Sequence, residues 1–237
     1  MEVNQFDSIK EGTILLIDKP YKWTSFDVVG KLRSLIKKFT GEKSAKIGHA
    51  GTLDPLATGL LVICTGKATK MVMNLTADSK EYIAKIKVGE TTPSFDLETN
   101  VDATYPFEHV TREMVETVLK SFTGKQMQEP PAFSAKYVNG KRAYEYARKG
   151  IVPKLEPVPI EILSIDLIEF SLPFIMLKIV CSKGTYIRAL ARDIGKALNT
   201  GAHLVELRRT RSGEFSVEQA LTIDEIEKKL SGSCNQC

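Results

Sequence analysis

Short apolar runs that end at proline or glycine alternate along this chain with amphipathic helical patterns, which restricts the fold to a sheet covered by helices. The apolar runs and one period-two pattern predict strands over residues 13–18, 59–64, 82–88, 160–170 and 174–181. Apolar spacings of three and four predict helices over residues 24–39, 111–122, 186–198 and 222–230. The order of these elements indicates an α+β (mixed α/β) domain with a central mixed or antiparallel sheet, flanking helices and one inserted loop.

The composition excludes several protein classes. Of the 237 residues, 43% are hydrophobic and 26% are charged, which is typical of globular proteins and unlike disordered or collagen-like chains. No apolar run approaches the roughly 20 residues that cross a bilayer, and the first ten residues lack the apolar segment of a secretory signal. We therefore expect a cytoplasmic protein without a membrane partner.

Charge is segregated along the chain although the net charge is only +4. Basic residues outnumber acidic ones by six to one over residues 31–50, seven to three over 121–160 and seven to two over 183–211, whereas residues 81–120 carry eight acids against four bases. Segregation of this kind is expected on a surface that binds a polyanion. The alternative is chance clustering on solvated faces, and charge alone does not decide between the two.

The cysteines do not form a recognisable metal site. Cys64 and Cys181 lie in apolar runs and are predicted to be buried core residues, while Cys234 and Cys237 form a lone CxxC in a polar tail. A structural zinc site needs four ligands, and the sequence offers no second pair at suitable spacing. The sequence therefore predicts no metal.

Residues 48–59 (GHAGTLDPLATG) are the stretch richest in chemically useful groups. A carboxylate, Asp54, precedes a proline between a basic region and a predicted buried strand. On its own, this pattern is more often a tight turn in which the aspartate bonds its own backbone. The functional reading is a carboxylate on a rigid loop that attacks, or stabilises, an electron-poor centre.

Two further segments have the same ambiguity. Residues 181–188 (CSKGTYIR) predict a strand, a turn and the first helical turn, where Arg188 could hold an anion or simply lie on a surface helix. Tyr82 opens a predicted strand on its apolar face and, considered alone, is a core residue.

Together these segments resemble the TruB family of tRNA pseudouridine synthases. The resemblance extends from about residue 14 to residue 222 and rests on motifs that occur in order: LIDKP at 16–20, GHAGTLDPLATG at 48–59, KEY at 80–82, CSKGTYIR at 181–188 and GAHLVELRR at 201–209. It implies a pseudouridine synthase fold in which residues 125–154 are an inserted thumb loop. It also implies an enzyme that isomerises uridine 55 in the T loop of tRNA to pseudouridine without a cofactor.

The resemblance assigns catalytic roles to three residues. Asp54 corresponds to the catalytic carboxylate, Tyr82 to the tyrosine that stacks on the target base, and Arg188 to the arginine that pairs with the carboxylate. Residues 91–96 depart from the pattern of many relatives, so the sequence assigns Asp96 no role.

The resemblance also assigns substrate-binding or supporting roles. His49 corresponds to a histidine that holds the opened loop, and Tyr186 to a tyrosine that contacts uracil. Leu207 corresponds to a leucine that lines the pocket, and Lys19 to a lysine that supports the catalytic loop.

The expected organisation is a single catalytic domain over residues 9–230, with 125–154 as a basic RNA-binding loop, 231–237 as a disordered tail and no PUA domain. The expected partner is the T arm of tRNA, bound by a monomer that needs no obligatory protein partner. Two alternatives stay open: a tRNA-folding chaperone, which could coexist with catalysis, and a guide-RNA-dependent subunit resembling dyskerin. The choice between covalent attack by Asp54 and elimination through a glycal-like intermediate also stays open.

Overall fold

The computed structural model describes residues 11–41, 45–138 and 140–233, and the chain divides into two compact units. Unit 1 combines residues 1–81 with residues 208–237, and unit 2 is residues 82–207. Two strands, β4 (Lys80–Val88) and β12 (Ala202–Ser212), contribute residues to both units. Cys234 and Cys237 lie outside the described residues.

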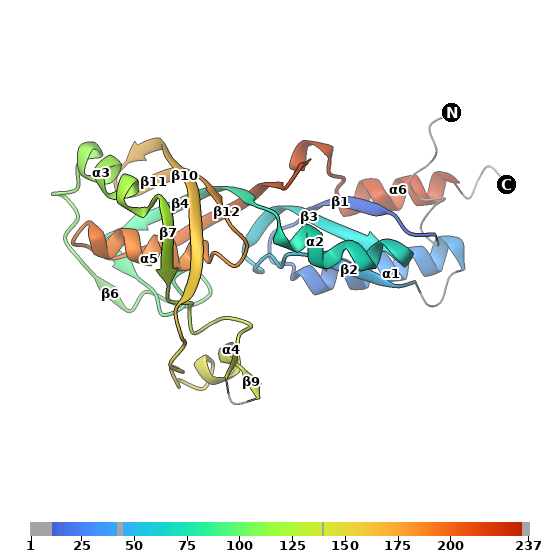
Figure 1. The fold of residues 1–237 in the computed structure, drawn as a ribbon, viewed down its shortest axis with the longest axis horizontal. Coiled ribbons are helices and arrows are strands. Elements are labelled where there is room, and N and C mark those ends of the chain that lie inside the picture. The colour runs from blue at the N-terminus through green and yellow to red at the C-terminus, as the bar shows by residue number, and fades with distance from the viewer. Residues whose placement is uncertain (1–10, 42–44, 139, 234–237) are drawn as a thin grey trace. The chain divides into compact units, whose positions relative to one another are not determined.

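The sheet of unit 1 has the order β1-β3-β12, with β2 paired to β3. Strand β1 (Ile14–Lys19) and β2 (Ile47–Ala50) both run antiparallel to β3 (Ala57–Thr65). A short strand, β13 (Phe215–Ser216), pairs with the end of β12. Helices α1 (Ser25–Thr40), α2 (Val72–Ala77) and α6 (Ile223–Ser233) complete the unit, with 3-10 turns at Gly66–Met71 and Val217–Gln219 (Figure 1).

Successive side chains of β3 point to opposite faces of the sheet, and both faces are buried. Leu61 and Ile63 pack with Ile17 in one cluster that also contains the apolar sides of α1 and α6. Leu60 and Val62 point to the opposite face and pack in a second cluster, to which α2 contributes. The continuous apolar run in the sequence therefore identified a strand covered on both faces.

Local signals set the ends of α1 where the sequence predicted them. The hydroxyl of Thr24 accepts a hydrogen bond from the Asp27 N–H, and the Asp27 carboxylate accepts one from the Thr24 N–H, which forms a capping box. Gly41 ends the helix in the left-handed region, with φ 72°. Thr222 and Glu225 form the equivalent pair at the start of α6.

The sheet of unit 2 has the order β12-β4-β11-β10-β7. Strands β10 (Val158–Ser171) and β11 (Phe174–Cys181) form an antiparallel hairpin, and β7 (Gly124–Gln128) pairs with β10. Unit 2 also contains helices α3 (Arg112–Phe122) and α5 (Ile187–Ala197). A separate two-stranded sheet is formed by β5 (Glu90–Thr91) and β6 (Ala103–Thr104). The predicted class, a sheet flanked by helices with an inserted segment, is confirmed.

Three parts of the prediction were wrong. Residues 125–154 are not one long loop, because most of β7, together with β8 (Tyr137–Val138), β9 (Lys141–Arg142) and α4 (Ala143–Ala147), lies within them. The segment with α4 and β9 extends from the ends of β7 and β10, away from the sheet of unit 2 (Figure 1). The eleven-residue strand β12 and the four-residue strand β2 were not predicted, because basic residues interrupt the apolar pattern of β12 and glycine interrupts that of β2.

The predicted burial of two cysteines is confirmed, since Cys64 and Cys181 are both buried. No helix in the described parts of the chain is both long and apolar enough to cross a membrane.

Candidate active site

Asp54 lies in a tight turn between β2 and β3. Its carbonyl accepts a hydrogen bond from the Ala57 N–H at 3.1 Å, so the turn closes just before β3 begins. The Asp54 side chain is half-buried. A turn is therefore present here, closed by a backbone hydrogen bond.

Both neighbours of Asp54 are bound by the segment that leads into α1. The Ser25 hydroxyl accepts from the Leu53 N–H at 2.9 Å and donates to the Leu53 carbonyl at 3.2 Å. The Lys22 N–H donates to the Pro55 carbonyl at 2.9 Å. Ser25 is 2% exposed, so solvent does not compete for its hydroxyl. The carboxylate therefore projects from a backbone that is fixed on either side.

Lys19 supports the same turn from beneath. Its side chain is fully buried, and its ammonium donates to the carbonyls of Pro20 at 2.9 Å, Trp23 at 2.5 Å and Pro55 at 3.3 Å. Burial lowers the pKa of Lys19 from 10.5 to about 8, although the negative charge of Asp54 opposes this shift. The contact with Pro55 agrees with the predicted supporting role.

Arg209 holds the two ends of the turn. Its guanidinium donates to the Leu60 carbonyl at 2.7 Å and to the Gly51 carbonyl at 3.0 Å, and the side chain is 1% exposed. Strand β12 approaches so closely that a Cβ on Gly59 would lie 2.3 Å from the Arg209 carbonyl oxygen. The sequence analysis included Arg209 in a motif but gave it no role, because its partners are 149 and 158 residues away along the chain.

His49 lies in β2, which leads into the turn. Its ring is half-buried, and within the described residues its Nδ1 is a buried atom without a hydrogen-bond partner. Burial lowers the pKa of His49, and the positive charge of Arg209 lowers it further. Both effects favour the neutral imidazole.

Unit 2 contains the remaining predicted residues. Tyr82 is buried, 8% exposed, at the start of the alternating pattern of β4, and Leu207 is half-buried in β12.

Arg188 is buried at the start of α5 and is held by a loop that the sequence analysis discounted. Its guanidinium donates to the carbonyls of Ser94 at 3.2 Å and Phe133 at 3.1 Å, and its Nε lies 3.5 Å from Asp96 Oδ2. The Arg188 and Asp96 side chains are 4% and 7% exposed. Asp96 therefore lies against a candidate site residue, although the departure of residues 91–96 from the pattern of many relatives left it without a role in the prediction.

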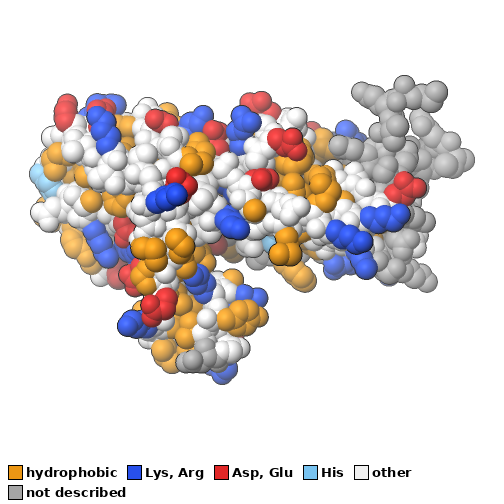
Figure 2. Space-filling view, in the orientation of Figure 1, with side chains coloured by type: hydrophobic (Ala, Val, Ile, Leu, Met, Phe, Trp, Pro, Cys, Tyr) orange, Lys and Arg blue, Asp and Glu red, His pale blue; other side chains and the backbone are white. Residues whose placement is uncertain are grey.

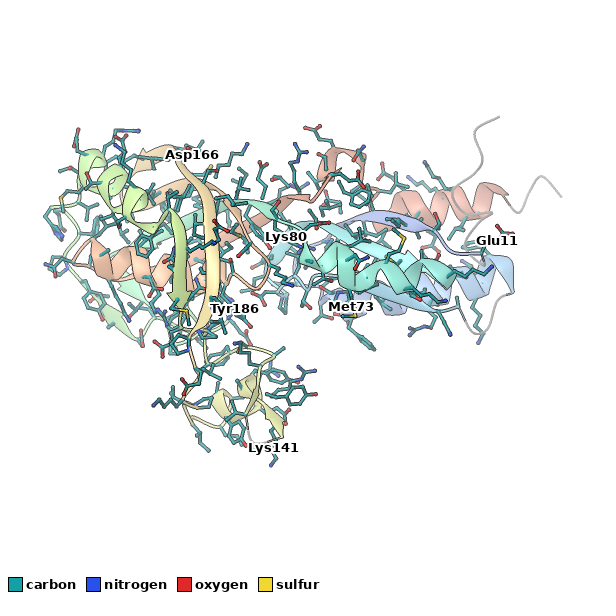
Figure 3. All side chains as sticks on the ribbon, viewed as in Figure 1. Glu11, Met73, Lys80, Lys141, Asp166 and Tyr186 are labelled. Atoms are coloured by element: carbon teal, nitrogen blue, oxygen red, sulfur yellow. The ribbon has the colours of Figure 1, made fainter. Side chains whose placement is uncertain are left out.

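Tyr186 immediately precedes α5, and its backbone is clamped by one side chain. Gln128, at the end of β7, accepts from the Tyr186 N–H at 2.8 Å and donates to the Tyr186 carbonyl at 3.1 Å. Figure 3 labels Tyr186 near the lower ends of β7 and β10. Gln128 is 3% exposed and was also missed, because nothing near it in sequence indicates this long-range contact.

The structure thus gathers the predicted residues into two sets. Lys19, His49 and Asp54 share one hydrogen-bonded region of unit 1, while Tyr82, Tyr186, Arg188 and Leu207 belong to unit 2. The predicted pairing of Asp54 with Arg188 joins one unit to the other and stays a prediction.

The segment with β8, β9 and α4 carries cations next to aromatic rings. The Arg142 guanidinium lies 3.9 Å from the ring centre of Tyr137, and that of Arg148 lies 5.3 Å from the ring centre of Tyr144. Figure 2 shows basic and apolar side chains on the visible face of this segment, and Figure 3 labels Lys141 at its tip. Basic and aromatic groups in such proximity suit contact with nucleic acid.

Comparisons with known proteins agree over nearly the whole chain. Residues 37–187 match the family model described as TruB family pseudouridylate synthase (N terminal domain), and residues 188–233 match the tRNA pseudouridylate synthase B C-terminal domain. The chain is 56% identical to tRNA pseudouridine synthase B of Phocaeicola vulgatus, over 94% of this chain and 95% of that protein. It is 49% identical to the protein of the same name from Flavobacterium johnsoniae, over 93% and 96% of the two chains.

Solved structures show the same fold. A Cbf5-Nop10-Gar1 complex matches with a TM-score of 0.69 and 30% identity, over 94% of this chain and 55% of that one. An H/ACA RNP bound to a substrate RNA containing 2′-deoxyuridine matches with a TM-score of 0.67 and 28% identity, over 94% and 54% of the two chains. The chain spans about half the length of these solved chains.

Proposed function

Because this chain belongs to the TruB family of pseudouridylate synthases, we propose that it isomerises uridine 55 in the T loop of tRNA to pseudouridine, with Asp54 as the catalytic carboxylate. The relatives named tRNA pseudouridine synthase B support tRNA, rather than a guide-RNA complex, as the substrate context.

The observation that carries the assignment of Asp54 is the fixation of its turn. Backbone groups of Leu53 and Pro55 are bound by Ser25, Lys22 and Lys19, so the backbone that bears the carboxylate is fixed on both sides. A catalytic group must be held within a fraction of an ångström of its reacting geometry, and such support provides this. A turn that merely connects two strands has no need of a fully buried lysine.

The reaction is an isomerisation, so the elemental composition of the nucleotide is unchanged. The bond from N1 of uracil to C1′ of the ribose breaks, and the bonding pair leaves with the base as a uracil anion. The base rotates, C5 bonds to C1′, the C5 proton is lost to solvent and N1 gains a proton. Asp54 would stabilise or attack the electron-poor C1′, as a carboxylate does in retaining glycosidases.

The other assignments give each remaining side chain a task. Tyr82 would stack on the detached base and Tyr186 would contact it, while Arg188 would direct the carboxylate. His49 would hold the opened RNA loop, and Leu207 would line the pocket. A uridine in a folded loop must be turned out of its stack before a carboxylate can reach C1′.

Residues 125–154 would close over the T arm. Their basic side chains would pair with phosphates and so position the RNA without reading its sequence. We expect the tRNA dissociation constant to rise steeply with salt, and a constant that is unchanged between low and moderate salt would contradict this assignment.

Substitution Asp54→Asn tests the function directly. With a tRNA transcript labelled with tritium at C5 of uridine, turnover releases tritium to water, and we expect the variant to lose at least about 10⁴-fold in rate while tRNA affinity stays within severalfold. Asp224→Asn, an exposed carboxylate of α6, is the matched control and should keep full turnover. An Asp54→Asn protein with normal turnover would refute the assignment.

The same variant separates catalysis from RNA folding. If Asp54→Asn restores growth of a deletion strain, the essential contribution is a chaperone action, which we propose as an accompanying role. Turnover by the isolated chain on tRNA would exclude dependence on a guide RNA. We expect this chain to act in the cytoplasm as a monomer without a protein partner, which light scattering on the purified protein would check.

A further inference from the structure

Three exposed side chains lie on the segment that holds the Asp54 turn. Tyr21 is 49% exposed and Phe26 is 71% exposed, and Lys22 between them also projects into solvent. The Lys22 ammonium lies 5.6 Å from the centre of the Tyr21 ring. We call Tyr21, Lys22 and Phe26 the aromatic–lysine patch.

The backbone ties this patch to the site. The Lys22 N–H donates to the carbonyl of Pro55, and Ser25, which precedes Phe26, binds both backbone groups of Leu53. The patch therefore lies beside the two residues that flank Asp54. All of these contacts are within unit 1.

Lys22 has a conformation that a lysine adopts at a cost. Its φ is 67°, in the left-handed region that glycine occupies freely and other residues rarely do. The turn thus has a lysine at a position where the backbone conformation favours glycine. The exposed ammonium contacts the Tyr21 ring at 5.6 Å and leaves its charge open to solvent.

The two aromatic rings have chemistry that suits an unstacked base. Phe26 is in the first turn of α1, where an apolar ring of this exposure adds nothing to the core. Bases that leave an RNA stack are commonly received on aromatic side chains, and a nearby cation pairs with the adjoining phosphate.

We propose that the aromatic–lysine patch binds nucleotides next to the uridine that reaches Asp54: Lys22 pairs with a backbone phosphate, and Phe26, with Tyr21, stacks on an unstacked base. The inference rests on the proposed function, because it needs an RNA at Asp54. It adds positioning residues to that function and assigns none of them a part in bond breaking.

Substitution Lys22→Gly is expected to weaken tRNA binding without lowering the stability of the protein. Glycine relieves the left-handed backbone, so the melting temperature should be unchanged or higher by up to about 3 °C. Affinity for an unmodified tRNA transcript should fall by about three- to tenfold, and the slope of log Kd against log salt should decrease by about 0.8. Lys228→Ala, which removes an exposed lysine of α6, is the matched charge control.

Two substitutions of Phe26 distinguish the need for an aromatic ring from the need for a large apolar side chain. Phe26→Leu should raise the KM for tRNA by at least about fivefold with little change in kcat, and Phe26→Trp should restore KM. Met73→Ala is the control, because Met73 is an apolar side chain of α2, a different element, and is 83% exposed (Figure 3).

The two proposals fail in different ways. If the unaltered chain does not release tritium from tRNA, the proposed function fails. If it does, the patch is refuted by a Lys22→Gly protein that binds as tightly as Lys228→Ala, by a Lys22→Gly protein that melts well below the unaltered chain, or by a Phe26→Leu protein with unchanged KM.

Discussion

Lys19 makes the stability of unit 1 depend on alkaline pH in a way that can be measured. Its buried ammonium donates to three carbonyls, yet burial still lowers its pKa from 10.5 to about 8. Substitution Lys19→Met keeps a long, unbranched side chain and removes the titrating group. A comparison of the two proteins at several pH values therefore isolates the contribution of this one lysine.

The sign follows from proton binding. Between pH 8 and 10.5 the unfolded chain keeps a proton on Lys19 that the folded chain has lost, so the free energy of unfolding rises with pH across this window. The full shift corresponds to about 3 kcal/mol. Between about pH 7.5 and about pH 9.5 the same linkage gives about 2 kcal/mol.

Urea unfolding of both proteins at these two pH values provides the assay. The free-energy difference, unaltered protein minus Lys19→Met, should increase by about 2 kcal/mol at the higher pH, because titrations of all other groups cancel in the subtraction. A difference that stays constant, or that decreases, would refute the reasoning. Lys228→Met, at an exposed position, should show no such change.

Three further substitutions test the supports of the site. Gly59→Ala places a Cβ 2.3 Å from a carbonyl oxygen of β12, so we expect a loss of about 2–4 kcal/mol in urea unfolding. Gln128→Leu removes both bonds to the Tyr186 backbone and should lower kcat for tRNA and cost about 1–3 kcal/mol of stability, and unchanged values for both would contradict the clamp. Asp96→Asn leaves the Arg188 cation without its carboxylate, so kcat should fall by about 10- to 100-fold while tRNA affinity is retained.

The sequence predicted those elements whose signals are local. The capping pair at Thr24 and Asp27 located the start of α1, and the apolar run of β3 identified a buried strand. Strand β12 was not predicted because Arg208 and Arg209 interrupt its apolar pattern. Arg209 is buried only because distant carbonyls receive its guanidinium, which no local pattern can reveal.

The candidate site divides in the same manner. A turn around Asp54 was one of two interpretations of residues 48–59, and the supporting role of Lys19 stays a prediction, with its bond to Pro55 as the contact that such a role would use. Asp96 and Gln128 were missed, since each acts on a residue more than fifty positions away. Their partners are determined by which strands become neighbours, and the sequence analysis predicted the strands without their order.

The division of the chain into units has a consequence for biosynthesis. Unit 2 is one continuous stretch, whereas unit 1 needs the end of β12, from Arg208 onward, and α6 to complete its sheet and core. As the chain leaves the ribosome, β1 and β3 emerge first but must wait for β12, while unit 2 can already fold. Pulse proteolysis of stalled nascent chains should therefore find residues 82–207 protected before the turn that bears Asp54.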